Sequence, residues 1–376
     1  MPGPQISLLP DGRRLHMNHG PIDLIVEAFG EPTEVKAAYA QAAARFQTIL
    51  TELVAELPDL RRRAGATVRA FAGSTALRME RAVVPLAEDA SPPRATRKSE
   101  DTSAPSSTQR TGDNSAPDLP PRTVRFITPM AAVAGAVADE MLAAMTARRA
   151  LSRAYVNDGG DIALHLAPGE SLKLAIAGAG HGLADRIAIH HADPVRGIAT
   201  SGWRGRSFSL GIADAVTVLA RTAAAADAAA TIIANAVDLP GHPAITRAPA
   251  DTLQPDTDLG ARLVTTAVGA LTPDEIAQAL SRGAAVAQDL ADRGLIAGAA
   301  LFLAGEARVV GIPGQLLMSA QTPSPVCFAN HLSPTPLGRG TASMAADENA
   351  ARPSATTRCV SSPPFHGGEV ASAASR

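Results

Sequence analysis

Apolar side chains recur with the period of an α-helix in several stretches of the chain. The clearest stretch is residues 34–57, where seven such positions fall on one face: Val35, Tyr39, Ala42, Phe46, Ile49, Leu53 and Leu57. Spacings of three and four residues predict an amphipathic helix. Two alanine-rich stretches, residues 130–149 and 223–237, predict further helices. Thr272-Pro273-Asp274-Glu275 has the sequence of a capping box and predicts a fourth helix, which extends to about Arg293.

Shorter apolar runs bounded by turn residues predict strands. Residues 5–28 predict a hairpin around a Pro-Asp-Gly turn, and residues 298–312 predict another that turns at Gly305-Glu306. Further strands are predicted at residues 153–157, 161–167, 171–178, 186–191, 214–220 and 263–271. The strands come in runs with helices between them, rather than in strict alternation. This order predicts an α+β fold with largely antiparallel sheets and with helices packed on one face.

Two segments show neither period. Residues 88–122 are rich in Pro, Ser, Thr and charge, and residues 324–376 are similarly polar. Such segments cannot bury enough apolar surface to offset their ordering entropy. We therefore expect a disordered linker or insertion at 88–122 and a disordered tail at 324–376. Residues 1–87 then supply the N-terminal hairpin and helix of the domain, and residues 123–323 supply its central part.

Composition narrows the function classes. The chain has 376 residues, a net charge of −2 and two cysteines far apart, Cys327 and Cys359. A near-neutral charge gives no basis for nucleic acid as a partner. The longest apolar runs are too short to span a bilayer, and the N-terminus lacks the pattern of a signal peptide. We therefore expect no membrane partner and a cytoplasmic location. The two cysteines form neither a disulfide framework nor a metal pair.

Several familiar nucleotide and hydrolase signatures are missing. Residues 178–183, Gly-Ala-Gly-His-Gly-Leu, resemble a dinucleotide-binding glycine run, but Leu183 replaces the small residue that close packing needs. A hairpin loop is the simpler interpretation. The sequence contains no Gly-Lys-Ser/Thr phosphate loop and no Gly-x-Ser-x-Gly motif. His190 and His191 would point to opposite faces of a strand, which argues against a shared metal.

Four short segments carry the candidate chemistry. They are residues 135–139 (GAVAD), 156–162 (VNDGGDI), 197–211 (GIATSGWRGRSFSLG) and 226–231 (ADAAAT). Each has a structural alternative when taken singly. Gly159-Gly160 is compatible with a simple hairpin turn, and residues 200–202 with a simple loop. Asp227 is compatible with a helix N-cap, and Thr231 with a hydrogen bond to its own helix backbone.

Taken in order, the four segments resemble the ApbE-like superfamily, whose members include flavin transferases that move FMN from FAD onto a protein. The resemblance covers about residues 128–237 and implies an ApbE-like, T-fold-like domain. It is closer to a shorter branch of the superfamily that shares "SFSLGIADAV" and "ADAAAT". The chain departs from the transferases in several respects. The His-Ile-Ile-Asp-Pro-like stretch after the Thr-Ser-Gly segment is missing, and Asp193-Pro194 precedes that segment instead of following it. The N-terminal Met-Gly-Thr segment and the exported-lipoprotein signal of the family are not evident.

The resemblance implies a Mg²⁺ ion bound by Asp227 and Thr231, with a further ligand from the backbone near Ala136 and Val137. Their i, i+4 spacing places Asp227 and Thr231 on one helix face, and both supply oxygen ligands, which Mg²⁺ prefers. The resemblance also implies a flavin-nucleotide site formed by Asn157, Gly159, Gly160, Asp161, Thr200, Ser201 and Gly202. Trp203, the sole tryptophan, would be placed to stack on a ring.

Two functions are therefore expected from the resemblance. One is an Mg²⁺-dependent enzyme that transfers FMN from FAD to a Thr or Ser of an acceptor protein. The alternative is a non-catalytic flavin- or metal-binding protein of a redox or cofactor pathway, which the missing stretch favours. The sequence assigns no catalytic residue and no particular acceptor, and its alanine-rich surface is compatible with a homodimer.

Overall fold

A computed structural model describes residues 3–87, 125–175 and 186–311. These residues all belong to one unit of the chain, residues 1–330. Three segments with predictions lie outside the described residues: the linker at 88–122, the glycine-rich segment at 178–183 and the tail at 324–376. Their predicted character is therefore still a prediction.

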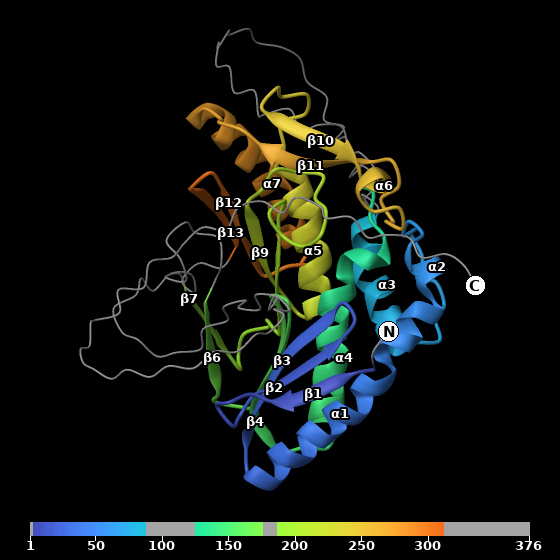
Figure 1. Ribbon diagram of the computed structural model, residues 1–376. Coiled ribbons are helices and arrows are strands. Elements are labelled where there is room, and N and C mark those ends of the chain that lie inside the picture. The colour runs from blue at the N-terminus through green and yellow to red at the C-terminus, as the bar shows by residue number, and fades with distance from the viewer. Residues whose placement is uncertain (1–2, 88–124, 176–185, 312–376) are drawn as a thin grey trace, which may run out of the picture. The chain divides into compact units, whose positions relative to one another are not determined.

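The centre of the described fold is a nine-stranded antiparallel sheet with the order β1-β2-β3-β4-β5-β8-β9-β12-β13 (Figure 1). Its strands are β1 (Gln5–Leu8), β2 (Leu15–His19), β3 (Ile22–Gly30), β4 (Leu151–Asp158), β5 (Asp161–Leu166), β8 (Gly197–Ser201), β9 (Ala215–Ala220), β12 (Gly298–Leu303) and β13 (Glu306–Gly311). Strands from the N-terminal segment and from the central segment pair directly, since β3 lies beside β4. Both segments therefore build one sheet.

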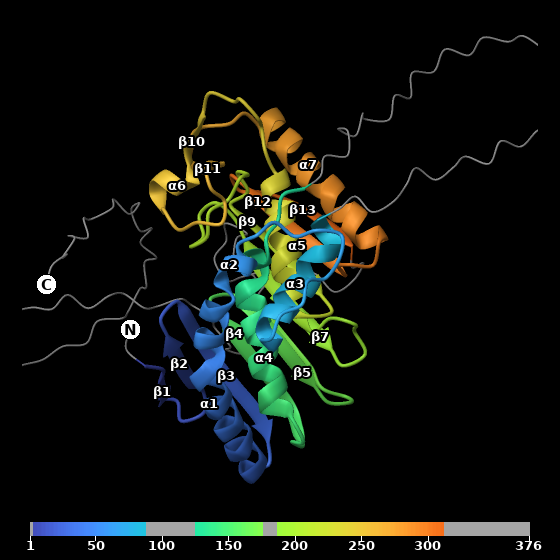
Figure 2. The ribbon, with the colours of Figure 1, turned by 90° about the vertical axis from the view of Figure 1, so that its right-hand side faces the viewer.

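Helices cover one face of this sheet. The helices of the described residues are α1 (Pro32–Ala55), α2 (Leu57–Leu60), α3 (Ser74–Ala87), α4 (Val133–Thr146), α5 (Ala223–Ala236), α6 (Ala250–Leu253) and α7 (Pro273–Asp292), with a 3₁₀ turn at Pro129–Ala132. Four of them, α1, α4, α5 and α7, lie directly on the sheet. Helix α4 packs on β4 and β5, and α5 packs on β8 and β9. Helix α1 lies against β3, and α7 lies against β12 and β13, as Figures 1 and 2 show. The predicted α+β fold with an antiparallel sheet and one helical layer is confirmed.

The many alanine and aliphatic residues of the chain fill the core between the sheet and the helices. The main core contains alanine at many helix positions, including Ala226, Ala229 and Ala230 of α5, which are almost fully buried. Small side chains on α4 and α5 let the helix backbones approach each other and the sheet closely. Residues 34–57 behave as their periodicity predicts, because Phe46, Ile49 and neighbouring apolar residues of α1 enter this core.

A second, smaller core lies on the opposite face of the sheet. The hairpin of β6 (Ser171–Ala175) and β7 (Arg186–His190) contributes Leu172, Leu174, Ile187 and Ile189, which pack with Tyr155 and other sheet residues. A separate two-stranded ribbon is formed by β10 (Ile245–Pro249) and β11 (Leu263–Val268). Hydrophobic contacts thus cover both faces of the central strands.

Local sequence signals located most elements, and the differences have physical causes. The capping box at Thr272 is present with both of its hydrogen bonds. Residues 5–28 form three strands instead of one hairpin, because Gly20 (φ +59°) allows a second tight turn. The last hairpin turns at Ala304 and Gly305, both with positive φ, one residue earlier than predicted. Helix α3 and strand β8 were not predicted.

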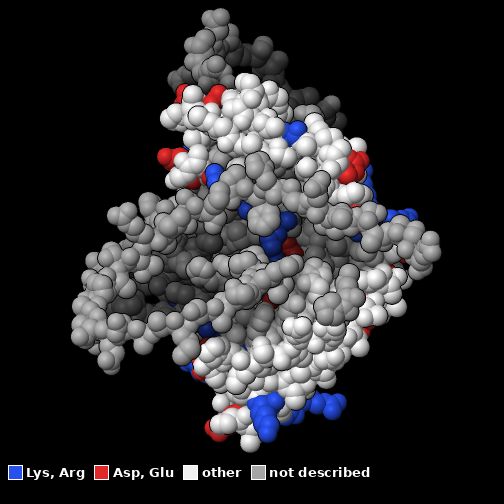
Figure 3. Space-filling view, in the orientation of Figure 1, with Lys and Arg blue, Asp and Glu red and all other residues white. Residues whose placement is uncertain are grey.

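The described residues include no helix that is long and apolar enough to cross a membrane. In Figure 3, charged side chains of the described residues occur in small groups, and most of the described surface in that view is uncharged. The expectation that nucleic acid is not a partner stays a prediction.

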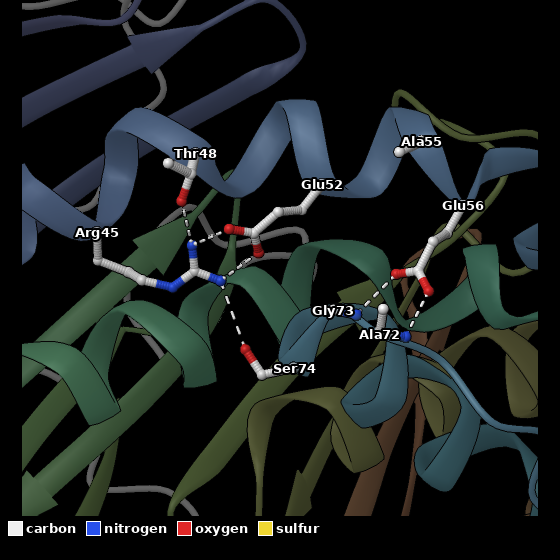
Figure 4. Close-up of a pocket in the computed structure, with 8 residues that line it drawn as sticks. All are labelled: Arg45, Thr48, Glu52, Ala55, Glu56, Ala72, Gly73 and Ser74. Atoms are coloured by element: carbon white, nitrogen blue, oxygen red, sulfur yellow. Dashed lines mark hydrogen bonds and ion pairs between the residues drawn. The ribbon is translucent and has the colours of Figure 1, made fainter.

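The open pocket drawn in Figure 4, of about 620 Å³, is lined by polar side chains that connect α1 with the start of α3. Arg45 of α1 binds Glu52 at 2.7 Å and Glu140 of α4 at 3.0 Å. Both carboxylate oxygens of Glu56 accept backbone N–H groups at the start of α3, from Ala72 and Gly73. The polar side chains that line the pocket are therefore already paired with one another or with the backbone.

Replacing Glu140 by Ala is expected to destabilise the fold by about 3 kcal/mol. The Glu140 carboxylate is buried and accepts hydrogen bonds from Arg45, Ser74 and Arg78, so its loss removes the ion pair of Arg78 and leaves Arg45 with Glu52 as its acidic partner. Urea unfolding of the variant measures the loss. The exposed pair Asp59–Arg62 is the control, and Asp59→Ala should change the unfolding free energy by no more than about 1 kcal/mol. Equal losses of unfolding free energy in the two variants would contradict this stabilising role of Glu140.

Candidate functional site

The turn between β4 and β5 consists of two glycines. Gly159 (φ +63°) and Gly160 (φ +117°) adopt backbone conformations that side chains with a Cβ rarely take. The side-chain oxygen of Asn157 accepts a hydrogen bond from the N–H of Gly160 at 2.8 Å and fixes the turn. These glycines therefore do form a hairpin turn. Their predicted contact with a flavin nucleotide, together with that of Asn157, stays a prediction.

Two aspartates face each other across this turn. Asp158 ends β4 and Asp161 begins β5, and they are partners in the strand register. Asp158 is only 4% exposed, and it accepts a long hydrogen bond of 3.5 Å from the N–H of Asp23. Asp161 accepts a hydrogen bond from the N–H of Thr200 at 3.2 Å. The sequence prediction included Asp161 but missed Asp158, although an aspartate on each side of the two glycines was a usable signal.

The segment Thr200-Ser201-Gly202 lies beside this turn because β8 pairs with β5. Thr200 and Ser201 end the strand β8, so the alternative that all three residues form only a loop is wrong. The hydroxyls of Thr200 and Thr217 are 2.9 Å apart and hydrogen-bonded. A Cβ on Gly202 would lie 2.4 Å from the carbonyl oxygen of Asp214. Glycine is therefore required there by backbone packing, whatever binds nearby.

Asp227 lies inside α5 and is not the N-cap of that helix. Thr222 is the N-cap, and its hydroxyl accepts the N–H of Ala225 at 3.2 Å. The carboxylate of Asp227 instead accepts the N–H of Gly135, in the first turn of α4, at 3.0 Å. The sequence alternative of a cap within its own helix is wrong. Asp227 binds a free N–H group at the start of a different helix.

Helix α4 returns the same interaction to α5. The two oxygens of Asp139 accept the N–H groups of Ala223 and Ala224 at 3.0 and 2.9 Å. The helices approach so closely that a Cβ on Gly135 would lie 2.3 Å from the carbonyl oxygen of Ala223. The motif Gly-x-x-x-Asp is thus explained by packing and capping. Negative charge at each helix N-terminus is also favoured by the helix dipole.

Val137 lies within α4, and its side chain is buried in the main core. It could offer a metal ion only its backbone carbonyl oxygen. Its predicted role as a ligand stays a prediction.

Asp158, Asp161 and Asp227 form one electrostatic cluster, which we call the carboxylate cluster. Burial, with a smaller contribution from the charge of Asp161, raises the pKa of Asp158 from 3.8 to about 8. Burial also raises the pKa of Asp227 well above its ordinary value; Asp161 and Asp158 add to the effect, and the N–H of Gly135 opposes it. Burial raises the pKa of Asp161 in the same direction. The cluster therefore favours bound protons or a bound cation.

The donor set fits a Mg²⁺ ion that is shared with a ligand. Across residues 3–87, 125–175 and 186–311, no three His, Cys, Asp or Glu side chains are grouped closely enough to hold a metal ion by themselves. Mg²⁺ is commonly bound by one or two carboxylates and completed by substrate phosphates and water. Thr231 lies one helical turn beyond Asp227 and is half-buried, and its hydroxyl forms no hydrogen bond with the described residues. The alternative that this hydroxyl binds its own helix backbone is therefore not supported.

Trp203 lies next to the site but its ring is already engaged. Its indole N–H donates to Asp214 at 3.2 Å, and the guanidinium of Arg204 lies 4.9 Å from the ring centre. Stacking of Trp203 on a flavin ring stays a prediction.

Comparisons with known proteins support a family of the ApbE/UPF0280 type. A family model described as "AbpE bacteria" matches residues 6–96 and 98–309, and the chain belongs to that family. This match extends over most of the sheet and over all four motif segments.

Curated relatives match a shorter part of the chain. A UPF0280 protein of Methanopyrus kandleri is 40% identical over 110 residues, which are 29% of this chain and 43% of the relative. A UPF0280 protein of Methanothrix thermoacetophila is 40% identical over 113 residues, 30% of this chain and 46% of the relative. One of Methanocaldococcus jannaschii is 37% identical over 118 residues, 29% of this chain and 45% of the relative. The chain thus spans less than half the length of these relatives.

Proposed function

We propose that this protein binds a flavin dinucleotide together with Mg²⁺ at the carboxylate cluster and, most concretely, transfers FMN from FAD to a Thr or Ser of an acceptor protein. In this transfer the acceptor oxygen forms a bond to the FMN phosphorus. The bond from that phosphorus to the AMP oxygen breaks, and AMP leaves.

The observation that supports the proposal is the electrostatic interaction of carboxylates from two separate chain segments. The β4–β5 turn supplies Asp158 and Asp161, and α5 supplies Asp227. One turn further along α5, the hydroxyl of Thr231 forms no hydrogen bond within the described residues. Asp161 raises the pKa of both Asp158 and Asp227, and neighbouring carboxylates of this kind are costly to keep ionised together unless a cation is bound. A structural role alone would need only Asp227, which caps α4.

Each residue would have a distinct task. Asp227 and Thr231 would hold the Mg²⁺, which neutralises charge on the diphosphate and on the leaving AMP. The N–H of Thr200 keeps the Asp161 carboxylate in place, and Asn157 keeps the glycine turn in shape. Thr200 and Ser201 stand at the end of β8 beside these groups and would contact the nucleotide.

The second candidate is a flavin- or metal-binding protein without turnover. It is favoured by the short connection from β8 to β9, residues 202–214, where the His-Ile-Ile-Asp-Pro-like stretch of the transferases is missing. The two candidates differ in one product. Incubation with FAD, Mg²⁺ and a Thr- or Ser-containing acceptor protein releases AMP only if the protein is a transferase.

Replacing Thr231 by Val is expected to weaken Mg²⁺-dependent FAD binding by about fivefold, because valine keeps the shape and removes the hydroxyl oxygen. Isothermal titration of FAD with and without Mg²⁺ measures the change. The matched control is Thr146→Val, since Thr146 is also a helix residue but its hydroxyl donates to the carbonyl oxygen of Leu142 at 2.8 Å. Equal Mg²⁺ dependence in wild type and in Thr231→Val would remove Thr231 from the proposed site.

A further inference from the structure

The segment after β8 is fastened to the sheet at its base. Both Trp203 and Arg204 donate hydrogen bonds to one oxygen of Asp214, at 3.2 and 2.6 Å. The other oxygen of Asp214 accepts the N–H of Ala304 at 2.6 Å, and the N–H of Trp203 donates to the carbonyl oxygen of Ala213 at 3.0 Å. Trp203 and Arg204, at the start of the segment after β8, are therefore held in place by Ala213 and Asp214.

Arg206, two residues beyond this anchor, lies directly on the glycine turn. A Cβ placed on Gly159 would be 1.8 Å from Nη2 of Arg206 and 2.9 Å from its Cζ. The guanidinium thus occupies the space that a side chain at position 159 would fill. Gly159 is required both by its positive φ and by this contact.

The guanidinium lies near acid groups without being tied to them. Its positive charge lowers the pKa of both Asp158 and Asp161, opposing the effect of burial. Yet within the described residues Arg206 forms no ion pair or side-chain hydrogen bond, and its side chain is exposed. Arg204, by contrast, is bound to Asp214. The guanidinium of Arg206 therefore lies against Gly159 without donating an N–H to any other described residue.

An arginine with free donors at the rim of a site is suited to one kind of ligand group. The planar guanidinium binds phosphate oxygens through two parallel hydrogen bonds, and its affinity for phosphate depends on geometry as well as charge. The neighbouring groups Asp158 and Asp161 would repel a phosphate on their own. A phosphate can therefore approach only where a cation, either the metal ion or Arg206, faces it.

We propose that Arg206 is a diphosphate-binding residue of this site, held over the Gly159–Gly160 turn in the free protein and bound to a phosphate of the flavin dinucleotide in the complex. The inference deepens the proposed function and rests on it for the identity of the ligand. It adds a recognition residue that stands outside the Asp227–Thr231 pair and on a different segment of the chain.

The test compares Arg206→Met with Arg206→Lys, using inorganic pyrophosphate with Mg²⁺ and FAD with Mg²⁺ as separate probes in isothermal titrations. Arg206→Met is expected to weaken the binding of both probes about tenfold or more, since a charge-assisted hydrogen bond is lost. Arg206→Lys keeps the charge but not the fork, and an intermediate loss is expected. Titration with Mg²⁺ alone should show equal or tighter binding in Arg206→Met, because a competing cation is gone.

Arg308→Met is the control, because Arg308 is an exposed arginine on β13 that forms no ion pair with the described residues. It should bind both probes as wild type does. Thermal unfolding of Arg206→Met should match wild type, since the side chain is exposed. Wild-type affinity of Arg206→Met for both probes would overturn the inference and leave the proposed function standing. If pyrophosphate binding depends on Arg206 but FAD does not bind, the proposed function is overturned and the diphosphate-binding role of Arg206 stands. If wild type binds neither probe, the proposed function and the inference on Arg206 are both overturned.

Discussion

Replacing Asp227 by Asn is expected to weaken Mg²⁺-dependent FAD binding by at least about 100-fold while leaving the protein as stable as wild type. The amide oxygen of asparagine can still accept the N–H of Gly135, which the carboxylate accepts at 3.0 Å. What is lost is the negative charge that a Mg²⁺ ion requires. Stability is not expected to fall, because the carboxylate is poorly solvated beside Asp161 and Asp158.

Two further variants separate charge from capping. Asp227→Ala removes the acceptor as well as the charge, and should in addition cost about 0.5–2 kcal/mol of stability. Asp139→Asn alters the reciprocal cap, in which Asp139 accepts the N–H groups of Ala223 and Ala224. Because Asp139 is not part of the carboxylate cluster, its variant should bind FAD within about threefold of wild type. Isothermal titration and urea unfolding of all three variants give both quantities.

The same experiments can contradict the metal site. If Asp227→Asn and Asp139→Asn have the same FAD affinity as wild type, with and without Mg²⁺, then Asp227 is only a cap between two helices. The proposal of a Mg²⁺-dependent function would then be falsified, while the described fold would be unaffected.

The free energy of unfolding in the absence of divalent cations is expected to fall as the pH rises from about 5 to about 8. The pKa of Asp158 is raised from 3.8 to about 8 in the folded protein, so between these values the folded state binds a proton that the unfolded state has released. Raising the pH then favours unfolding, by up to about 1.4 kcal/mol per pH unit for each such group. Asp161 and Asp227 shift in the same direction and add to the slope.

Carboxylates with lowered pKa do not obscure this window. The pKa of Glu275 is lowered from 4.5 to about 2. Its contribution to stability is therefore fully present above about pH 5 and is lost only at lower pH. Urea unfolding at several pH values measures the slope for wild type and for Asp158→Asn. The variant should have a smaller slope and should be the more stable protein at about pH 8. Addition of Mg²⁺ at that pH should raise the stability of wild type, and identical slopes in the two proteins would show that Asp158 keeps an ordinary pKa.

The sequence by itself determined the elements whose signals are local. The apolar period of residues 34–57 gave α1, because burial of one helix face requires that spacing. Thr272 and Glu275 gave the start of α7, since the two hydrogen bonds of a capping box join residues only three positions apart. The short apolar runs bounded by turn residues predicted most of the antiparallel strands and with them the α+β class. The order of four short motifs also indicated which part of the chain carries the candidate site.

Only the tertiary structure decided how those motifs are used. Asp227 binds Gly135, 92 positions earlier in the chain, and no local pattern specifies that partner. Asp158 joins the carboxylate cluster because β4 and β5 pair in one particular register and α5 contacts β5. Strand β8 was missed because its residues are buried by long-range contacts with β5, β9 and α5 rather than marked by alternation. Contacts between distant segments depend on the packing of whole helices and strands, and a local sequence pattern records only which face of each is apolar.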